Sequence, residues 1–347
     1  ANRDTAKYCS GCGAALLSGV PASAPPSSPA PVQAQDAGQV LQQRYQIEKE
    51  LGRGGFGAVY RATDLNLQRV CAVKENLDAS QEAQRQFMRE ATVLANLSHP
   101  NLPRVTDHFF IPGKGQYLVM DFVDGADLAT LAEQPGKVTV SQAVEWISQV
   151  ADALVYMHGQ SQPVLHRDIK PSNIRITPQG RAMLVDFGLV KFYAPNLKTT
   201  IGARAVTPGF APPEQYGRGT TDARTDIYAL GATLYALLTG EQPPESVQRM
   251  AGERLTPVSQ LNPAVPAHIS QATEKAMALE PRQRFASAGE FLAALRAAPV
   301  RAAAATPSAS AAPASAAPAS VAPARPPSDP RVAVARPPVA HPAQAVP

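Results

Sequence analysis

The chain contains few cysteines and no apolar stretch long enough to cross a membrane. Only 3 of its 347 residues are Cys, which excludes the disulfide-rich scaffold of small secreted proteins. No run approaches the roughly 18 uninterrupted apolar residues of a membrane span. No basic-then-apolar signal peptide opens the chain either. We therefore expect a cytoplasmic protein with no membrane span in this sequence.

The part of the chain that is expected to fold, residues 45–296, has no net charge. The formal net charge is +4, but residues 297–347 carry +3 and residues 1–44 carry +1. Residues 45–296 are therefore neutral overall. The net positive charge belongs to the tails and does not indicate a basic face for nucleic acid. We expect no nucleic-acid partner.

Proline is abundant but confined to certain stretches. Of 34 Pro, 12 lie in residues 297–347 and 5 in residues 21–31. The tail at 297–347 is rich in Ala and Pro and has almost no large apolar residue, so it is expected to be disordered. Residues 1–17 hold a small cysteine motif, residues 18–44 are expected to be a Pro/Ser/Gln-rich linker, and residues 45–296 are expected to fold.

Within residues 45–296, strand patterns come before helix patterns. Short runs rich in apolar and β-branched residues predict strands at 45–51, 58–62, 69–74, 105–111 and 116–121. Helical spacing predicts helices at 80–97, 138–158 and 226–238. The sequence thus predicts an α+β fold with a small β-rich lobe at 45–121, a connection at 122–125 and a larger helical lobe at 126–296.

A glycine-rich segment lies between the first two predicted strands. Glycines allow the backbone to approach a polyphosphate closely and to present its N–H groups. A dinucleotide-binding fold would place a helix after the glycines, whereas a strand is predicted here. We interpret the segment as a strand–turn–strand flap, and a plain glycine hairpin is the alternative. Its residues are Leu51, Gly52, Arg53, Gly54, Gly55, Phe56, Gly57, Ala58 and Val59.

A lysine at the end of a later predicted strand comes before an acidic residue on the predicted helix. Lys74 follows Cys71, Ala72 and Val73, and Glu90 lies sixteen residues further on. A strand Lys paired with a helix Glu holds a fixed cation against α- and β-phosphates. An ordinary surface ion pair is the alternative.

The third motif concentrates polar groups in a short stretch. The sequence His166-Arg167-Asp168-Ile169-Lys170-Pro171-Ser172-Asn173 is followed by Asp186-Phe187-Gly188. Asp168 is suited to accept a proton from a hydroxyl, and Lys170 to neutralise a transferring phosphoryl group. Asn173 and Asp186 offer the hard oxygen ligands that Mg²⁺ prefers. A polar loop between strands is the alternative.

In this order, the motifs resemble those of bacterial eukaryotic-type serine/threonine protein kinases. The resemblance covers residues 45–296 and includes Asp226 near a helix start, Glu214 in Ala211-Pro212-Pro213-Glu214, and Arg284 as the partner of Glu214. It implies the two-lobed protein kinase fold, ATP and Mg²⁺ as cofactors, and proteins with Ser or Thr hydroxyls as substrates. A pseudokinase-type binding scaffold and a small-molecule phosphotransferase are the alternatives.

The resemblance also implies roles for single residues. Lys74 would hold the α- and β-phosphates and pair with Glu90, Asp168 would be the catalytic base, and Lys170 would contact the γ-phosphate. Asn173 and Asp186 would bind Mg²⁺. The adenine would lie between Val59 and Ala72 above, Met120 as gatekeeper behind, and the backbone of Asp121 and Val123. Arg175 departs from the family, which places an apolar residue beneath the adenine.

Two further expectations lie outside the catalytic motifs. A phosphate on Thr199 or Thr200 is expected to pair with Arg167 and Lys191 after autophosphorylation, and the alternative is an unmodified loop. Cys9 and Cys12 resemble half of a zinc ribbon, which needs four ligands. We expect a second Cys pair upstream, with zinc bound only in the complete ribbon; a redox dithiol or a chance pair is the alternative.

Overall fold

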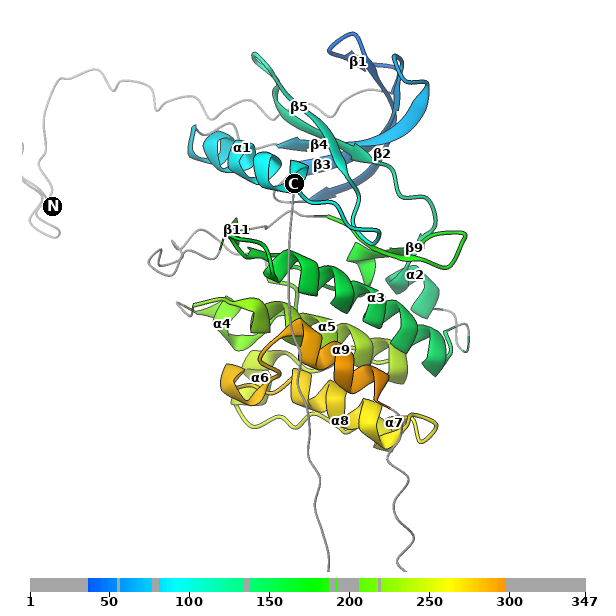
Figure 1. The fold of residues 1–347 in the computed structure, drawn as a ribbon, viewed down its shortest axis with the longest axis vertical. Helices are drawn as coiled ribbons and strands as arrows, with labels where there is room; N and C mark the ends of the chain where they lie inside the picture. Colours follow the sequence, from blue (N-terminus) through cyan, green and yellow to red (C-terminus); the bar gives the residue numbers. More distant parts are fainter. Residues whose placement is uncertain are drawn as a thin grey trace, which may run out of the picture. The chain divides into compact units, whose positions relative to one another are not determined.

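A sheet lobe and a helical lobe make up the described part of the chain (Figure 1). The computed structural model describes residues 37–54, 57–76, 81–133, 136, 138–186, 191–192, 206–217 and 220–297. The sheet lobe comes first in the sequence and the helical lobe follows, as the patterning predicts.

An antiparallel six-stranded sheet forms the first lobe, with strand order β1-β2-β3-β4-β6-β5. Its strands are β1 (Val40–Leu41), β2 (Tyr45–Gly54), β3 (Gly57–Asp64), β4 (Arg69–Asn76), β5 (Val105–Ile111) and β6 (Gly115–Asp121). Along β3, buried and half-buried residues alternate, because successive side chains point to opposite faces of the sheet. Each predicted strand is present, with ends that differ by up to three residues.

The described fold includes residues that precede the predicted boundary at Tyr45. Val40 and Leu41 of β1 pair with Gln46 and Tyr45 of β2. Arg44 forms ion pairs with Asp64 at 2.8 Å and Asp107 at 3.3 Å. The end of the expected linker is therefore part of the sheet, because Leu41 is buried and Arg44 joins two distant strands.

One helix, α1 (Gln81–Ala95), lies beside the sheet. Sequence spacing places it at 80–97. Its residues Ala91 and Leu94 are buried, whereas Met88 is exposed, so one face packs towards the protein.

The helical lobe is built around two long helices. Its helices are α2 (Leu128–Ala132), α3 (Val140–His158), α4 (Pro213–Tyr216), α5 (Ala223–Thr239), α6 (Ser246–Met250), α7 (Val258–Leu261), α8 (Ala267–Ala276) and α9 (Ala288–Arg296). A capping box between Thr139 and Gln142 starts α3, satisfying backbone N–H groups that have no partner within the helix. Asp222 caps α5. That helix therefore begins three residues before the predicted start.

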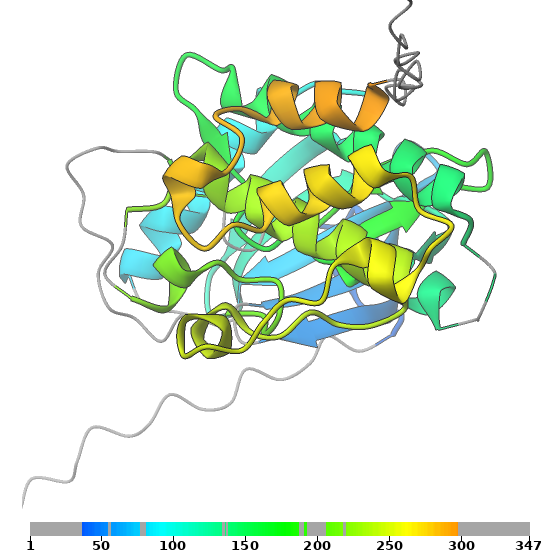
Figure 2. The ribbon, with the colours of Figure 1, turned by 90° about the horizontal axis from the view of Figure 1, so that it is seen from below.

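Helix α5 is buried along almost its whole length. A Cβ added at Gly231 would lie 2.7 Å from the Cβ of Ala276, so the glycine permits the close approach of α8. Figure 2 shows α8 and α9 on the side of this lobe that faces away from the sheet.

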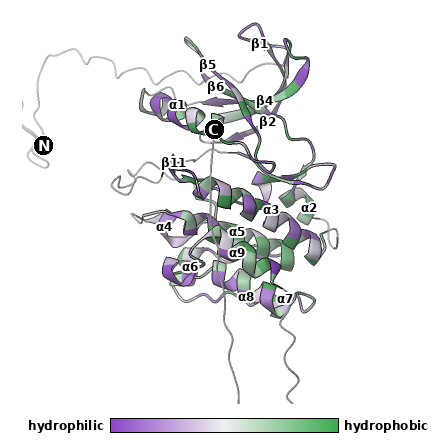
Figure 3. Cartoon of the chain, viewed as in Figure 1, coloured by the Kyte–Doolittle hydropathy of each residue, from purple (hydrophilic) through white to green (hydrophobic). Residues whose placement is uncertain are grey.

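The main hydrophobic core extends through both lobes. It includes Ala72 and Met120 of the sheet and Leu154 and Leu230 of α3 and α5. Figure 3 shows that hydrophobic residues concentrate along the packed helices. Within the described part of the chain, no helix is both long and apolar enough to span a membrane.

Two small sheets lie between the lobes and carry the predicted catalytic segments. One has the order β10-β9-β7 and the other pairs β11 with β8. The strands are β7 (Ala126–Asp127), β8 (Val164–Leu165), β9 (Ile174–Ile176), β10 (Ala182–Leu184) and β11 (Lys191–Phe192). Residues 166–173 connect β8 to β9, so strands at both ends position this loop.

Candidate active site

Asp168 lies at the centre of a group of four polar side chains. Its Oδ1 accepts a hydrogen bond from Thr207 Oγ1 at 2.8 Å. Its Oδ2 lies 3.0 Å from both Lys170 Nζ and Asn173 Nδ2. Lys170 Nζ also donates to Thr207 Oγ1 at 3.1 Å. The structure thus brings together three predicted site residues from one loop and Thr207 from a distant segment.

The loop backbone is held by Asp226, a buried residue near the start of α5. Its carboxylate accepts hydrogen bonds from the backbone N–H of His166 at 2.9 Å and of Arg167 at 2.8 Å. His158 Nε2 lies 2.9 Å from the same carboxylate. Burial alone would raise the pKa of Asp226, but His158, His166 and the Arg167 N–H together lower it. Asp226 is therefore ionised and anchors a loop backbone that would otherwise leave donors unpaired.

His166, the first residue of the loop, is fully buried. Its Nε2 lies 3.2 Å from the carbonyl oxygen of Val185, and its Nδ1 accepts from the N–H of Asp168 at 3.4 Å. Burial lowers the pKa of His166 although Asp226, Asp168 and Asp186 oppose this. A neutral ring that donates from Nε2 and accepts at Nδ1 fits both contacts.

Lys74 reaches the loop from the sheet lobe. Its Nζ lies 2.7 Å from Asp186 Oδ1, and the Lys74 charge lowers the pKa of Asp186 against the effect of burial. Asp186 has a left-handed backbone with φ of 61°. Among the described residues, the ion pair of Lys74 is formed with Asp186 rather than with Glu90 as the sequence suggests. Glu90 is half-buried on α1.

The glycine-rich segment forms a hairpin of β2 and β3, as predicted. Gly54 pairs with Gly57 at its tip, and Gly55 and Phe56 lie outside the described residues. A Cβ at Gly57 would collide with the carbonyl oxygen of Glu75, so β3 approaches β4 closely there. Arg53 Nη2 contacts Glu50 at 2.6 Å and the Tyr60 hydroxyl at 3.0 Å.

The predicted base-binding residues lie next to this hairpin. Ala72 and Met120 are buried neighbours on β4 and β6, and Val59 packs against the same core. Residues 121–125, here called the hinge segment, lead from β6 towards β7 and contain Asp121 and Val123. Leu51 and Gly52 on β2 are exposed, as Arg53 is, and Ala58 is buried.

Glu214 and Arg284 form the buried ion pair that the sequence suggests. Arg284 Nη1 and Nη2 lie 2.6 Å and 3.0 Å from the two carboxylate oxygens. The Arg284 side chain is 0% exposed and also donates to the carbonyls of Ala278 and Leu279. This bidentate ion pair connects the segment that follows Thr207 to the end of the helical lobe.

Some contacts of the site were not predicted from the sequence. Arg167 Nη2 donates to Thr221 Oγ1, Gln215 Nε2 donates to the Arg167 carbonyl at 2.8 Å, and His158 contacts Asp226. These partners are 48 to 68 residues apart in the chain. No local spacing signals such contacts, because they depend on how the helices pack.

Several predicted residues lie outside the described part of the chain, namely Cys9, Cys12, Thr199 and Thr200. Lys191 is described only as part of β11, paired with Leu165. Among the described residues, no three His, Cys, Asp or Glu side chains are grouped to hold a metal ion.

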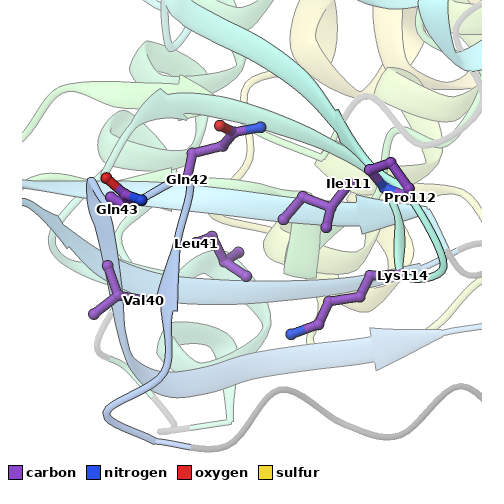
Figure 4. Close-up of a pocket in the computed structure, with 7 residues that line it drawn as sticks. All are labelled: Val40, Leu41, Gln42, Gln43, Ile111, Pro112 and Lys114. Carbon is purple, nitrogen blue, oxygen red and sulfur yellow. The ribbon is translucent and has the colours of Figure 1, made fainter.

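A pocket on the sheet lobe contains none of the predicted site residues. Figure 4 shows it between the turn after β1 and the turn between β5 and β6. Val40, Leu41, Gln42, Gln43, Ile111, Pro112 and Lys114 line it. The residues that suggest chemistry lie instead between the lobes.

Comparison with known proteins places this geometry in a family. Residues 45–288 match the family described as "Protein kinase domain". The chain is 37% identical over 269 residues to serine/threonine-protein kinase PknJ of Mycobacterium bovis, covering 73% of this chain and 45% of that protein. It is 32% identical over 265 residues to the probable serine/threonine-protein kinase PknB of Lactococcus lactis, covering 74% and 42%. The chain thus spans less than half the length of these relatives.

A solved structure agrees with this assignment. The crystal structure of the Mycobacterium tuberculosis PknI kinase domain has a TM-score of 0.60 and 29% sequence identity, covering 76% of this chain and 98% of that one. The shared fold confirms the predicted two-lobed architecture. The chain belongs to the protein kinase family and carries a kinase domain of the bacterial serine/threonine type.

Proposed function

We propose that this chain transfers the γ-phosphoryl group of ATP to Ser and Thr hydroxyls of proteins. The observation that carries the proposal is the group around Asp168, where one carboxylate is held by Thr207, Lys170 and Asn173. Protein kinases act mainly by positioning groups and neutralising charge. A rigid carboxylate beside a fixed cation suits that task.

In the proposed reaction, the substrate hydroxyl oxygen bonds to the γ-phosphorus. The bond from that phosphorus to the bridging oxygen breaks, and ADP leaves. Asp168 takes the hydroxyl proton, and Lys170 neutralises charge on the transferring group. Lys74 binds the α- and β-phosphates, and its three donors allow it to keep Asp186 as a partner. The hydrogen bond from Thr207 holds Asp168 in place for the incoming hydroxyl.

The residues present suit Mg²⁺. Asn173 uses its Nδ2 for the carbonyl and carboxylate of Asp168 at 2.8 and 3.0 Å, which leaves its amide oxygen as a potential ligand. Asp186 offers a carboxylate that is 45% exposed and ionised because Lys74 lowers its pKa. These are the hard oxygen donors that Mg²⁺ binds. When bound, Mg²⁺ supplies charge neutralisation on the phosphates.

The proposal is tested with Asp168→Asn. The chain is incubated with labelled ATP, Mg²⁺ and a generic basic protein, and phospho-Ser and phospho-Thr are measured. We expect the wild type to transfer phosphate, and the variant to bind ATP but lose transfer by about 100-fold or more. Transfer by Asp168→Asn at the wild-type rate would remove Asp168 from its role. A wild type that binds no nucleotide would refute the proposal as a whole.

A zinc site at Cys9 and Cys12 is a separate proposal that rests on their spacing alone. Two thiolates provide half of a tetrahedral site. We therefore expect the chain to bind zinc weakly, or to share one ion between two molecules, and Cys9→Ser to remove this binding. A monomer that binds one zinc ion tightly would contradict the half-site.

A further inference from the structure

Arginines contact the hinge segment at several of its residues. The side chain of Asp121 accepts hydrogen bonds from two arginines. Its Oδ1 lies 3.2 Å from Arg69 Nη1, and its Oδ2 lies 3.1 Å from Arg104 Nε. The guanidinium carbon of Arg61 lies 5.5 Å from the ring centre of Phe122, within cation–π distance. The first two residues of the hinge segment are thus held through their side chains.

Arg175 holds the next part of the hinge segment through its backbone. Its Nε donates to the Val123 carbonyl at 3.1 Å, and its Nη2 donates to the Gly125 carbonyl. One planar guanidinium therefore joins two carbonyls that are two residues apart. The guanidinium of Arg175, at the position where the family places an apolar residue beneath the adenine, thus donates to the protein's own backbone.

The position of Arg175 favours this contact. It is the middle residue of β9, opposite Asp127 of β7 and Met183 of β10, and it follows Asn173 by two residues. Gly125 lies so close to β9 that a Cβ would collide with the carbonyl oxygen of Ile176, and its φ of 119° suits glycine. Because β9 and the hinge segment are in contact, the Arg175 side chain lies close to the carbonyls of Val123 and Gly125.

Arginine is suited to this position because its donors form a rigid fork. A fixed fork loses less conformational entropy per hydrogen bond than a flexible ammonium group, and bonds from a charged donor are stronger than neutral ones. A leucine or methionine at the same place would leave both carbonyls to water. A lysine would keep the charge but lose the fork.

We propose that Arg175 is a positioning residue that fixes the hinge backbone of the nucleotide site before the nucleotide binds. This inference rests on the proposed kinase function, in which the backbone of residues 121–123 contacts the base. A backbone held in its binding geometry avoids the entropy cost of ordering upon binding. Arg175 thereby couples β9, which follows Asn173 of the catalytic loop, to the segment that binds the base.

The test compares Arg175→Met and Arg175→Lys with the wild type in the full chain. Methionine keeps an apolar stem under the base but removes both donors. We expect its dissociation constant for a fluorescent ADP derivative and its KM for ATP to rise about tenfold, with kcat within about threefold. Amide hydrogen exchange in residues 122–126 should become faster. The nucleotide affinity and the hinge exchange rate of Arg175→Lys should lie between those of Arg175→Met and those of the wild type.

Arg181→Met is the matched control, because Arg181 is an exposed arginine that immediately precedes β10 of the same small sheet. It should bind nucleotide as the wild type does. If Arg175→Met matches the wild type in nucleotide affinity and hinge exchange, the inference fails. A lower melting temperature with unchanged KM would also overturn it, since that result describes a merely structural role. A wild type that does not bind the ADP derivative would instead refute the proposed function.

Discussion

Lys74 Nζ and Asp186 Oδ1, from different lobes, lie 2.7 Å apart in the structure. The lysine side chain is 10% exposed and the aspartate 45%, so the contact is partly screened by solvent. It joins β4 of the sheet lobe to the residue two positions after β10. The Lys74 ammonium has three donors, so it is able to bind a polyphosphate while it keeps this carboxylate as a partner. The ion pair therefore holds both groups in place for the proposed phosphates and Mg²⁺.

Replacing either partner should separate catalysis from folding. Lys74→Met and Asp186→Asn should each lower phosphate transfer about 100-fold or more, because each removes a charge that positions the nucleotide. The melting temperature should fall by only a few degrees, since the pair is partly exposed. Labelled-phosphate transfer and thermal unfolding measure the two effects. Lys114→Met is a control at a distance from the site and should retain transfer.

Two results would contradict the proposed roles of Lys74 and Asp186. Transfer at the wild-type rate by Asp186→Asn would show that the carboxylate takes no part in holding Mg²⁺ or phosphate. A variant that fails to fold would show that the ion pair is mainly structural.

The buried pair of Glu214 and Arg284 should matter for stability instead. Arg284→Met leaves the Glu214 carboxylate, whose side chain is 8% exposed, without its bidentate partner. Breaking a buried ion pair from one side costs about 3–5 kcal/mol of unfolding free energy. Urea unfolding measures this loss. The exposed neighbour Arg282 is the control, and Arg282→Met should change stability by less than about 0.5 kcal/mol.

A double variant tests the origin of that loss. Glu214→Gln combined with Arg284→Met removes both charges, so its loss should be smaller than the sum of the single losses. Additive losses would mean that the two side chains stabilise the protein independently.

The sequence predicts the parts of the site whose geometry is local. Asp168, Lys170 and Asn173 lie within six residues of one loop, so their grouping follows from the loop itself. The contact of His158 with Asp226 crosses 68 residues, and that of Arg175 with Val123 crosses 52. These depend on how separate elements pack. The pairing of Lys74 is a similar case, because the position of Asp186 relative to the sheet is a property of the tertiary structure.

The sequence does not predict strand β1, for a different reason. It is two residues long, too short for an alternating pattern to appear, and it follows a segment rich in proline and serine. Its place in the fold comes from pairing with β2 and from the ion pairs of Arg44.

The buried His166 should make the protein less stable in mild acid. Burial lowers its pKa in the folded protein below the value of about 6.5 in an unfolded chain. As the pH falls below about 6.5, the unfolded chain takes up a proton that the folded protein does not. The free energy of unfolding therefore falls as the pH drops towards the folded-state pKa, by at most about 1.4 kcal/mol per pH unit for this group.

His166→Tyr should reduce this slope, because tyrosine does not titrate in the range and its hydroxyl is able to donate a hydrogen bond. Urea unfolding between pH 5 and pH 7.5 measures the slope. Part of this slope should persist in the variant because of His108, since burial lowers the pKa of that residue as well. An unchanged slope in the variant would contradict a neutral His166.

Autophosphorylation is expected on Thr199 or Thr200. Arg167 donates to Thr221 Oγ1 in the structure, and a phosphate offers it a stronger acceptor with about −1.5 to −2 charges. A phosphate that pairs with Arg167 and Lys191 would attach Thr199 or Thr200 to the catalytic loop and raise activity. Thr207 is not the expected acceptor, because its hydroxyl already bonds to Asp168 and Lys170.

Mass spectrometry of protein made in cells tests this expectation. Wild-type protein should carry phosphate on Thr199 or Thr200, and Asp168→Asn should carry none, because the reaction needs its own catalytic base. Thr199→Ala combined with Thr200→Ala should lower transfer to the basic protein about tenfold, with unfolding unchanged because the fold contacts of Arg167 with Thr221 and Asp226 remain. An active wild type without phosphate between Asp186 and Glu214 would refute the expectation. Phosphate on Asp168→Asn would show that another kinase adds it.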